Sequence, residues 1–517
     1  MSKINTSDLI LSILSGVLFT ISHIVPYTGF LSWILLTPLF IAIEDKRPFH
    51  ALCLGVLTGT VLNVIGSYWL IETLSRFGGF PFPISLLFLL ILSFYSGLSI
   101  GIFTLVISIL NLLKKRGYLP VIVIASVWTS IEYLFPFLFP YTIANPQAHF
   151  LPIIQISDLF GIYAVSFLII FVNVTLMRVY KFMRKQGPIP HYEITISILL
   201  LTLTLIYGFW RIKTEKRIMA DSPKIKVGIV QANFNFLEKI EEHQENMIEI
   251  HKSMSQSLNY PDLIIWPETA ILLWISTSSD QLVKNGNTAI PDIKGTYFVV
   301  GGLSYESNET SPDETDYENI TKYNTAFLTD SDGNIIGRYH KIKLLLFGEY
   351  LPFSSWIPAL KKLSPATGDF IPGNELNLFE IKEKGIKIAP LICYEDIIPS
   401  FSRKFVKKGA NLIINLTNDG WFGESTAPYQ HLLLSIPRAV ENRRYLIRST
   451  NTGISAIIDP IGRVTDKTDI FQKTNLEGEV GLLEGRETLY TRIGDLFPWA
   501  CLVFWIGYAF IIVFKKK

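Results

Sequence analysis

In three segments from the second half of the chain, an apolar run ends at a residue whose side chain can take part in a chemical reaction. LIIWPETA contains Glu268, RYHKIKLLLFGEYLP contains Lys341 and Glu349, and PLICYEDIIPS contains Cys393 shortly before Glu395. Acyl transfer through a thiol needs a nucleophile, a base and a group that stabilises the oxyanion, and these residue types supply all three. Each segment alone also fits a plainer role: a capping glutamate, a surface lysine or a cysteine buried in a strand.

The charges around Cys393 limit how its thiol can be activated. Nearby carboxylates disfavour a standing thiolate, whereas a nearby lysine favours it. We therefore expect a glutamate to take the thiol proton during attack. Lys341 would offset the carboxylates and stabilise the oxyanion, together with a backbone N–H near Tyr394.

The elements that must position these residues belong to a layered α/β domain. From about Lys224 to Arg486, short β-rich runs alternate with polar stretches that are compatible with helices. Asp332-Gly333-Asn334 reads as a hairpin turn between two of the strands. The predicted strands include Ile225–Gln231, Asp262–Trp266, Thr296–Leu303, Asn324–Thr329, Ile386–Cys393, Asn411–Asn415 and Gly453–Ile458.

The rest of the chain has the composition of a membrane protein. Of the 517 residues, 49% are hydrophobic and only 17% are charged. Eight segments reach or approach the ~20 apolar residues needed to cross a bilayer. They are Leu9–Val25, Phe30–Ile43, Ala51–Ile71, Pro83–Leu113, Leu119–Phe139, Ile153–Met177, Ile194–Trp210 and Leu496–Phe514.

Basic residues in the loops predict the orientation of these spans, because Lys and Arg near span ends stay on the cytoplasmic side. The basic loops alternate so that both termini lie in the cytoplasm and the α/β domain lies outside. Arg211 and its basic neighbours conflict locally with this topology, which long translocated domains tolerate. Glu132 and Asp158 lie within or beside spans, and two acids are too few for a transport pathway.

Other classes of partner and cofactor are disfavoured. The net charge of +2 is small and no dense basic stretch is interleaved with aromatics, so nucleic acid is not expected as a partner. Cys53 and Cys501 lie in apolar runs without a partner at metal-ligand or redox spacing. Neither HExxH nor a Gly-rich phosphate loop before a helix occurs, so we expect no metal and no cofactor.

Five motifs in the second half of the chain resemble those of a known enzyme superfamily. WPE, YHK…FGEY, CYE, NLTNDGWFG and RSTNTG together resemble the carbon–nitrogen hydrolase (nitrilase) superfamily. With spans on both sides, the chain resembles more narrowly the apolipoprotein N-acyltransferase family of the bacterial envelope. The resemblance implies a polytopic α-helical membrane domain of about eight spans and an extramembrane nitrilase-like αββα sandwich. Residues 1–212 would be the transmembrane domain, 213–490 the catalytic domain, and 491–517 the last span and cytoplasmic tail.

The resemblance also implies roles for individual residues. Glu268 would be the general base, Lys341 the oxyanion-stabilising lysine and Cys393 the acylated nucleophile. The remaining residues that it assigns would support or line the site: Glu349, Tyr394, Glu395, Trp421 and Phe422.

The activity that the resemblance implies is transfer of a fatty acyl chain through a thioester. The donor would be a phospholipid, with phosphatidylethanolamine expected, and the acceptor would be the α-amine of the diacylglyceryl cysteine of an apolipoprotein. The protein would be a multi-pass protein of the bacterial cytoplasmic (inner) membrane, with its catalytic domain on the periplasmic side. Departures from the family pattern occur at Phe236 and Ile240 in VQANFNFLEKI and at Phe135, and they leave the three catalytic residues unchanged.

An acyltransferase must also lift a lipid tail to its thiol, so apolar loops are expected near the site. Phe353 to Leu360 favours a membrane-facing lid. Leu344 to Phe347 fits such a loop or the sandwich core equally well. Trp421 and Phe422 would line an acyl channel, while Trp421 can also pack under a sheet. His431 is expected to be structural, and one of Arg443, Arg444 and Arg448 is expected to be buried and paired.

Two alternatives remain at this point. A membrane-tethered amidase or nitrilase would use the same Glu-Lys-Cys triad with water as acceptor, although one or two spans would suffice for it. A transporter or assembly factor would carry a catalytically dead outer domain. The joint presence of Glu268, Lys341 and Cys393 argues against the latter.

Overall fold

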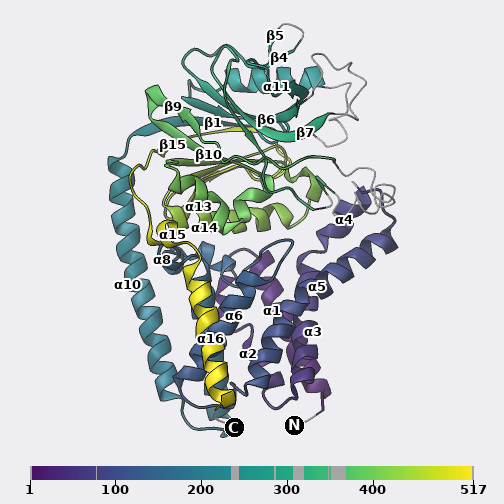
Figure 1. Cartoon of the computed structure of the whole chain (residues 1–517), viewed down its shortest axis with the longest axis vertical. Helices are drawn as coiled ribbons and strands as arrows, with labels where there is room; N and C mark the ends of the chain where they lie inside the picture. The colour runs from purple at the N-terminus through teal and green to yellow at the C-terminus, as the bar shows by residue number, and fades with distance from the viewer. Residues whose placement is uncertain are drawn as a thin grey trace. The chain divides into compact units, whose positions relative to one another are not determined.

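The computed structural model describes residues 3–76, 78–234, 244–284, 287–306, 320–346, 348–350 and 368–514. The chain divides into two units (Figure 1). The first comprises Met1–Glu72, Pro81–Thr214 and Thr488–Lys517. The second comprises Thr73–Phe80 and Glu215–Glu487. Helix α10 (His191–Asp221) contains the junction between Thr214 and Glu215.

The first unit is helical. Five of its described helices are long and apolar enough to cross a membrane: α1 (Thr6–Ile24), α3 (Pro48–Gly66), α5 (Phe82–Ile109), α9 (Tyr163–Met183) and α10. The chain is therefore a multi-pass membrane protein. The shorter elements are η1 (Gly29–Trp33), α2 (Thr37–Ile43), α6 (Tyr118–Leu134), η2 (Asn145–His149), α7 (Leu151–Ile154), α8 (Ser157–Phe160), α15 (Leu489–Ile493) and α16 (Leu496–Phe514). Helix α4 (Trp69–Arg76) begins in the first unit, and its residues from Thr73 on belong to the second.

Three of the predicted spans are interrupted, and one of them, Ala51–Ile71, is divided between α3 and α4. The segment Ile153–Met177 is not one helix, because Gly161 has a φ of +74° after α8 and α9 begins only at Tyr163. A Cβ at Gly161 would lie 2.8 Å from the ring of Tyr490, so the close packing of that ring requires glycine. The segment Phe30–Ile43 is likewise divided into η1 and α2.

Close contacts hold the helices of this unit together. A Cβ on Gly59 of α3 would lie 2.6 Å from the Cα of Gly97 in α5, so glycine lets the two backbones approach. Asp158 accepts a hydrogen bond from Arg211 Nε at 2.7 Å. The arginine that conflicted with the predicted topology is thus ion-paired within the first unit.

The second unit contains two large sheets. One has the strand order β15-β1-β2-β6-β7-β8, with β3 paired to β6, and the other has the order β14-β13-β12-β11-β10-β9. The strands of the first are β1 (Lys224–Gln231), β2 (Leu263–Ile265), β3 (Ile271–Ser276), β6 (Tyr297–Glu306), β7 (Thr321–Thr329), β8 (Ile335–His340) and β15 (Thr474–Gly481). Those of the second are β9 (Phe379–Ile381), β10 (Ile386–Ile392), β11 (Leu412–Thr417), β12 (Tyr445–Thr450), β13 (Ala456–Ile458) and β14 (Val464–Lys467). A separate pair joins β4 (Val283–Lys284) to β5 (Asn287–Thr288).

Helices cover the outer face of each sheet (Figure 1). Helix α11 (Gln244–Gln256) contacts β1 and β3, while α13 (Pro399–Lys407) contacts β10 and α14 (Ala427–Asn442) contacts β12. Strands β1 and β12 contact each other across the two sheets, as do β7 and β10. The predicted αββα sandwich is confirmed. Every residue of β2 and of β11 is buried, as strands covered on both faces require.

The pairing of the strands places the reactive residues at strand ends. Strands β1, β2 and β6 are parallel, as are β10, β11 and β12. Glu268 follows β2 and Cys393 directly follows β10. The short helices η5 (Lys382–Lys384), η6 (Cys393–Ile397) and η7 (Asp419–Phe422) lie in the connections of the second sheet.

Candidate active site

Glu268 lies in a tight turn after β2 that several contacts fix. Thr269 has a φ of +51°, so the chain reverses sharply there. A Cβ on Gly301 of β6 would lie 2.3 Å from the carbonyl oxygen of Pro267 and 2.6 Å from Cα of Glu268. Glycine at 301 therefore allows the turn to pack against β6. The carboxyl group of Glu268 is buried by this packing, with 6% of the residue exposed.

Lys341 follows β8 and reaches both acidic residues of the predicted set. Its Nζ lies 2.8 Å from Glu349 Oε2 and 3.4 Å from Glu268 Oε1. The backbone N–H of Lys341 donates to the carbonyl of Asn324 at 2.9 Å, which anchors the lysine to the neighbouring strand β7. The structure thus brings Glu268, Lys341 and Glu349 together, although 81 positions separate the first from the last.

Asn324 is a site residue that the sequence reasoning missed. Its Nδ2 donates to Glu268 Oε1 and to Glu349 Oε1, both at 2.8 Å. The amide therefore spaces the two carboxyl groups that flank Lys341. From the sequence, Asn324 is only the first residue of the predicted strand Asn324–Thr329. Its sequence signal is limited to a polar amide shortly before the apolar run Ala326–Leu328. The pairing of β7 with β8 that places Asn324 near Lys341 is visible in the structure alone.

Cys393 lies between β10 and η6 with a φ of +50°, a backbone conformation that is uncommon outside glycine. Burial raises the pKa of its thiol well above the ordinary value, and Glu268 raises it further. Lys341 acts in the opposite direction and lowers the thiol pKa by less. The thiol is therefore protonated at rest, as the local charges predicted, and attack requires a base.

Lys341 keeps its charge in this buried setting. Burial by itself lowers the pKa of its ammonium, but Glu349 and then Glu268 outweigh this effect and the net shift is upward. The charge of Lys341 also lowers the pKa of the Cys393 thiol. A fixed positive charge of this kind stabilises negative charge that develops at an adjacent carbonyl.

Glu395 ties the cysteine turn to the lysine segment. Its Oε1 accepts hydrogen bonds from the N–H groups of Ile342 and Lys343 at 2.8 and 2.9 Å, and from the Tyr339 hydroxyl at 2.7 Å. Its Oε2 accepts from the N–H of Ile392 at 2.9 Å. Burial raises the pKa of this carboxyl to about 7, against the opposing effect of the hydrogen bonds.

The aromatic residues predicted to line the site are divided between two turns. Tyr394 lies in η6, and burial raises the pKa of its phenol to about 12, with Tyr350 contributing. Trp421 and Phe422 lie in η7, where Phe422 is buried and Trp421 is partly exposed.

Of the predicted apolar loop, Leu344 to Leu346 are partly buried, whereas Phe347 and the predicted lid Phe353 to Leu360 lie outside the described residues. Phe236 and Ile240 lie outside them as well.

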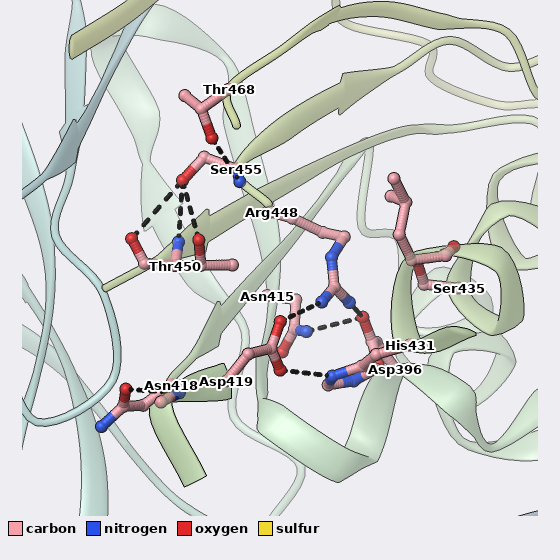
Figure 2. A network of polar contacts seen from close by, with 12 residues as sticks. Asp396, Asn415, Asn418, Asp419, His431, Ser435, Arg448, Thr450, Ser455 and Thr468 are labelled. Carbon is pink, nitrogen blue, oxygen red and sulfur yellow. Dashed lines mark hydrogen bonds and ion pairs between the residues drawn. The ribbon is translucent and has the colours of Figure 1, made fainter. Parts of the chain in front are cut away.

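A second group of charged residues joins the two turns (Figure 2). Arg448 of β12 pairs with Asp396 of η6, and His431 of α14 bridges Asp396 and Asp419. Arg448 confirms the prediction of a buried, paired arginine among Arg443, Arg444 and Arg448. Arg443 and Arg444 are buried too and donate to backbone carbonyls, including those of Pro460 and Ala410.

Comparison with known proteins gives two family matches. Residues 226–488 match the carbon–nitrogen hydrolase family. Residues 15–175 match the apolipoprotein N-acyltransferase N-terminal domain. The two matched ranges lie mainly in the second and the first unit, respectively.

Individual relatives cover nearly the whole chain. Apolipoprotein N-acyltransferase of Geobacter metallireducens is 35% identical over 522 residues, covering 99% of this chain and 96% of that protein. The protein of the same name from Bdellovibrio bacteriovorus is 31% identical and covers 89% and 86%. A crystal structure of Saccharomyces cerevisiae Nit3, of the nitrilase superfamily, is 19% identical with a TM-score of 0.35, covering 52% of this chain and 94% of that one.

Proposed function

The chain belongs to the apolipoprotein N-acyltransferase family, with a carbon–nitrogen hydrolase domain, and we propose how this enzyme N-acylates lipoproteins. It transfers a fatty acyl chain from a phospholipid to the α-amine of the diacylglyceryl cysteine of an apolipoprotein. One observation carries the proposed chemistry: the buried ammonium of Lys341 is held 2.8 Å from Glu349 Oε2 and 3.4 Å from Glu268 Oε1.

In the first half-reaction the Cys393 sulfur attacks the ester carbonyl of the phospholipid. A bond forms between sulfur and carbon while Glu268 takes the thiol proton. Glu268 Oε2 has no hydrogen-bond partner within the described part of the chain, which supports a role as proton acceptor. The ester C–O bond then breaks, the proton passes to the leaving oxygen, and a lysophospholipid departs.

In the second half-reaction the amine of the acceptor attacks the thioester carbonyl. A C–N bond forms, the C–S bond breaks, and the proton lost by the amine returns to the sulfur by way of Glu268. Lys341 stabilises the oxyanion in both half-reactions, because its charge is already in place before the substrate arrives. Asn324 and Glu349 hold that charge in position.

The membrane setting is part of the same proposal. Residues 213–490 form the catalytic domain on the periplasmic side of the bacterial inner membrane, between membrane segments 1–212 and 491–517, with both termini cytoplasmic. The five long apolar helices and the matched range 226–488 support this division. Phosphatidylethanolamine is the proposed acyl donor.

A mass measurement tests the proposal. The purified protein is incubated with phosphatidylethanolamine, and its intact mass is measured before and after neutral hydroxylamine. We expect a hydroxylamine-labile gain of one fatty acyl chain that is absent from Cys393→Ala and retained in the matched control Cys53→Ala. Absence of both the adduct and lysophospholipid from folded protein would contradict the proposal. Release of ammonia from a small amide without lipid would then identify the membrane-tethered amidase.

A further inference from the structure

Four charged residues from four separate elements meet in the interior of the second unit (Figure 2). We call Asp396, Asp419, His431 and Arg448 the buried charge cluster. Asp396 lies in η6, Asp419 in η7, His431 in α14 and Arg448 in β12. At most 1% of Asp396, Asp419 and Arg448 is exposed, and 11% of the His431 side chain is. Charges so deeply buried are expensive unless they are paired.

The geometry around His431 requires its charged form. Its Nδ1 lies 2.8 Å from Asp419 Oδ1 and its Nε2 lies 3.0 Å from Asp396 Oδ1. A neutral imidazole donates from only one nitrogen, whereas an imidazolium donates from both. With two carboxylates facing it, the ring is satisfied as a cation. The two negative charges of Asp396 and Asp419 then balance the two positive charges of His431 and Arg448.

Arg448 and Asn415 complete the arrangement. Arg448 pairs with Asp396 Oδ2, and its other terminal nitrogen lies 3.7 Å from Asp419 Oδ2. Asn415 of β11 donates to Asp396 Oδ2 at 2.6 Å. The charged groups that face His431 are therefore Asp396, Asp419 and Arg448. If the ring lost one proton, the cluster would have a net negative charge. One ring nitrogen of His431 would then be a hydrogen-bond acceptor facing a carboxylate oxygen, so that contact would be repulsive.

The cluster connects the two turns that carry the site. Asp396 is three positions from Cys393 in η6, and Asp419 begins η7, which ends in Trp421 and Phe422. Each turn contributes one carboxylate, and the same imidazole holds both. Glycine at 453 lets the chain pack against the second turn, because a Cβ there would lie 2.3 Å from Asp419 Oδ2.

We infer that His431 is a positioning residue for acyl transfer: as a cation it holds the nucleophile turn of Cys393 at a fixed distance from the Trp421–Phe422 turn. The inference rests on the proposed function, since it holds that the cluster positions the Cys393 thiol for the proposed acyl transfer. When the ring loses its proton, the two turns separate and the thiol no longer faces its substrate correctly. Acyl transfer is therefore lost at alkaline pH because His431 loses its proton, and not because one of the reacting groups titrates.

The pH at which acyl transfer is lost follows from the surroundings of the ring. Burial and Arg448 lower the pKa of His431, but Asp419 and Asp396 outweigh them and raise it to about 9. A histidine whose pKa is raised in the folded state stabilises that state at lower pH, and this contribution is lost as the pH rises through about 9. Removing one of the two carboxylates lowers the pKa and moves the loss to lower pH.

Two rates measured across pH 6 to about pH 10 test the inference. One is acyl-enzyme formation by intact mass. The other is iodoacetamide alkylation of Cys393 by peptide mass, which needs no lipid. The variants are His431→Gln and Asp419→Asn, with the exposed His191→Gln as matched control.

We expect the wild type and His191→Gln to lose acyl-enzyme formation above about pH 9, with a break in alkylation at the same pH. In Asp419→Asn both features move to lower pH. In His431→Gln acyl-enzyme formation is slower by on the order of 10²-fold at every pH, without an alkaline limb, because a misplaced nucleophile costs about that much.

Unchanged pH profiles in folded Asp419→Asn and His431→Gln, with melting temperatures near that of the wild type, would overturn the inference. A shifted alkylation break without any acyl-enzyme would support the cluster and contradict the proposed function. An acyl-enzyme with an unshifted limb in Asp419→Asn would support the function and contradict the cluster. Gly453→Ala adds a variant that displaces Asp419 without removing its charge. Slower acyl-enzyme formation is expected for it, with an alkaline loss that moves to lower pH by less than in Asp419→Asn.

Discussion

Two groups of buried charges in the second unit differ in their balance. Around Lys341, the carboxyl groups of Glu268 and Glu349 face one cation within the described part of the chain, with the neutral amide of Asn324 between them. In the buried charge cluster, Asp396 and Asp419 face Arg448 and His431, so the charges of the two kinds are equal in number.

The difference separates reactivity from positioning. Excess acid around Lys341 keeps the ammonium charged and the Cys393 thiol protonated, which is the state from which base-assisted attack begins. The balanced cluster holds two turns in place and contributes no group to the reaction. An unbalanced buried charge costs stability and persists where function needs it.

The largest effect is expected from removing the cation of the first group. Lys341→Met leaves Glu268 and Glu349 facing each other and removes the charge that lowers the thiol pKa. Acyl-enzyme formation should fall by on the order of 10³-fold, measured by intact mass.

Lys343→Met is the matched control, because that lysine is two positions away and exposed. It should change the rate by less than about twofold. A folded Lys341→Met protein with the wild-type rate would remove the distinction between the two groups of charges.

An intermediate effect is expected from adding an acid to the unbalanced group. Asn324→Asp places a third carboxyl group between Glu268 and Glu349 and removes both hydrogen bonds of the amide. Acyl-enzyme formation should fall by on the order of 10²-fold at neutral pH. Since crowded carboxyl groups have raised pKa values, the new residue takes up a proton as the pH falls, and part of the rate should return.

The exposed Asn377→Asp serves as the control and should follow the wild-type pH profile. If Asn324→Asp shows no recovery at acidic pH although it remains folded, repulsion among the carboxyl groups is not the cause of its defect.

The smallest effect is one of opposite sign. Glu268→Gln removes a carboxylate that raises the pKa of Cys393, so iodoacetamide should alkylate this thiol faster, by up to about tenfold, at mildly alkaline pH. The same variant lacks the proposed base and should form acyl-enzyme much more slowly.

The exposed Glu380→Gln is the control for both rates and should alter neither. If Glu268→Gln slowed both alkylation and acylation, the role of Glu268 would be structural. The excess of carboxyl groups around Lys341 would then not control the reactivity of the Cys393 thiol.

Several features of this molecule could be predicted from the sequence because they are local. A run of apolar residues that ends in Glu268 or Cys393 is visible in a short stretch, and so is the hydropathy of the long helices. The alternation of strands and polar stretches predicted a layered α/β domain, and the resemblance that the motifs carry implied the αββα sandwich. The breaks in the predicted spans did not, because the one at Gly161 depends on the ring of Tyr490, more than 300 positions away.

The sequence by itself determined the residue types that do chemistry, their places at strand ends and the membrane character of the chain. Only the tertiary structure decided which charges face each other. Asn324 acquires its place between Glu268 and Glu349 through strand pairing, and Arg448 meets Asp396 across 52 positions. The physical reason is that the pKa of a buried group and the cost of its charge depend on neighbours in space, which propensity and periodicity along the chain do not specify.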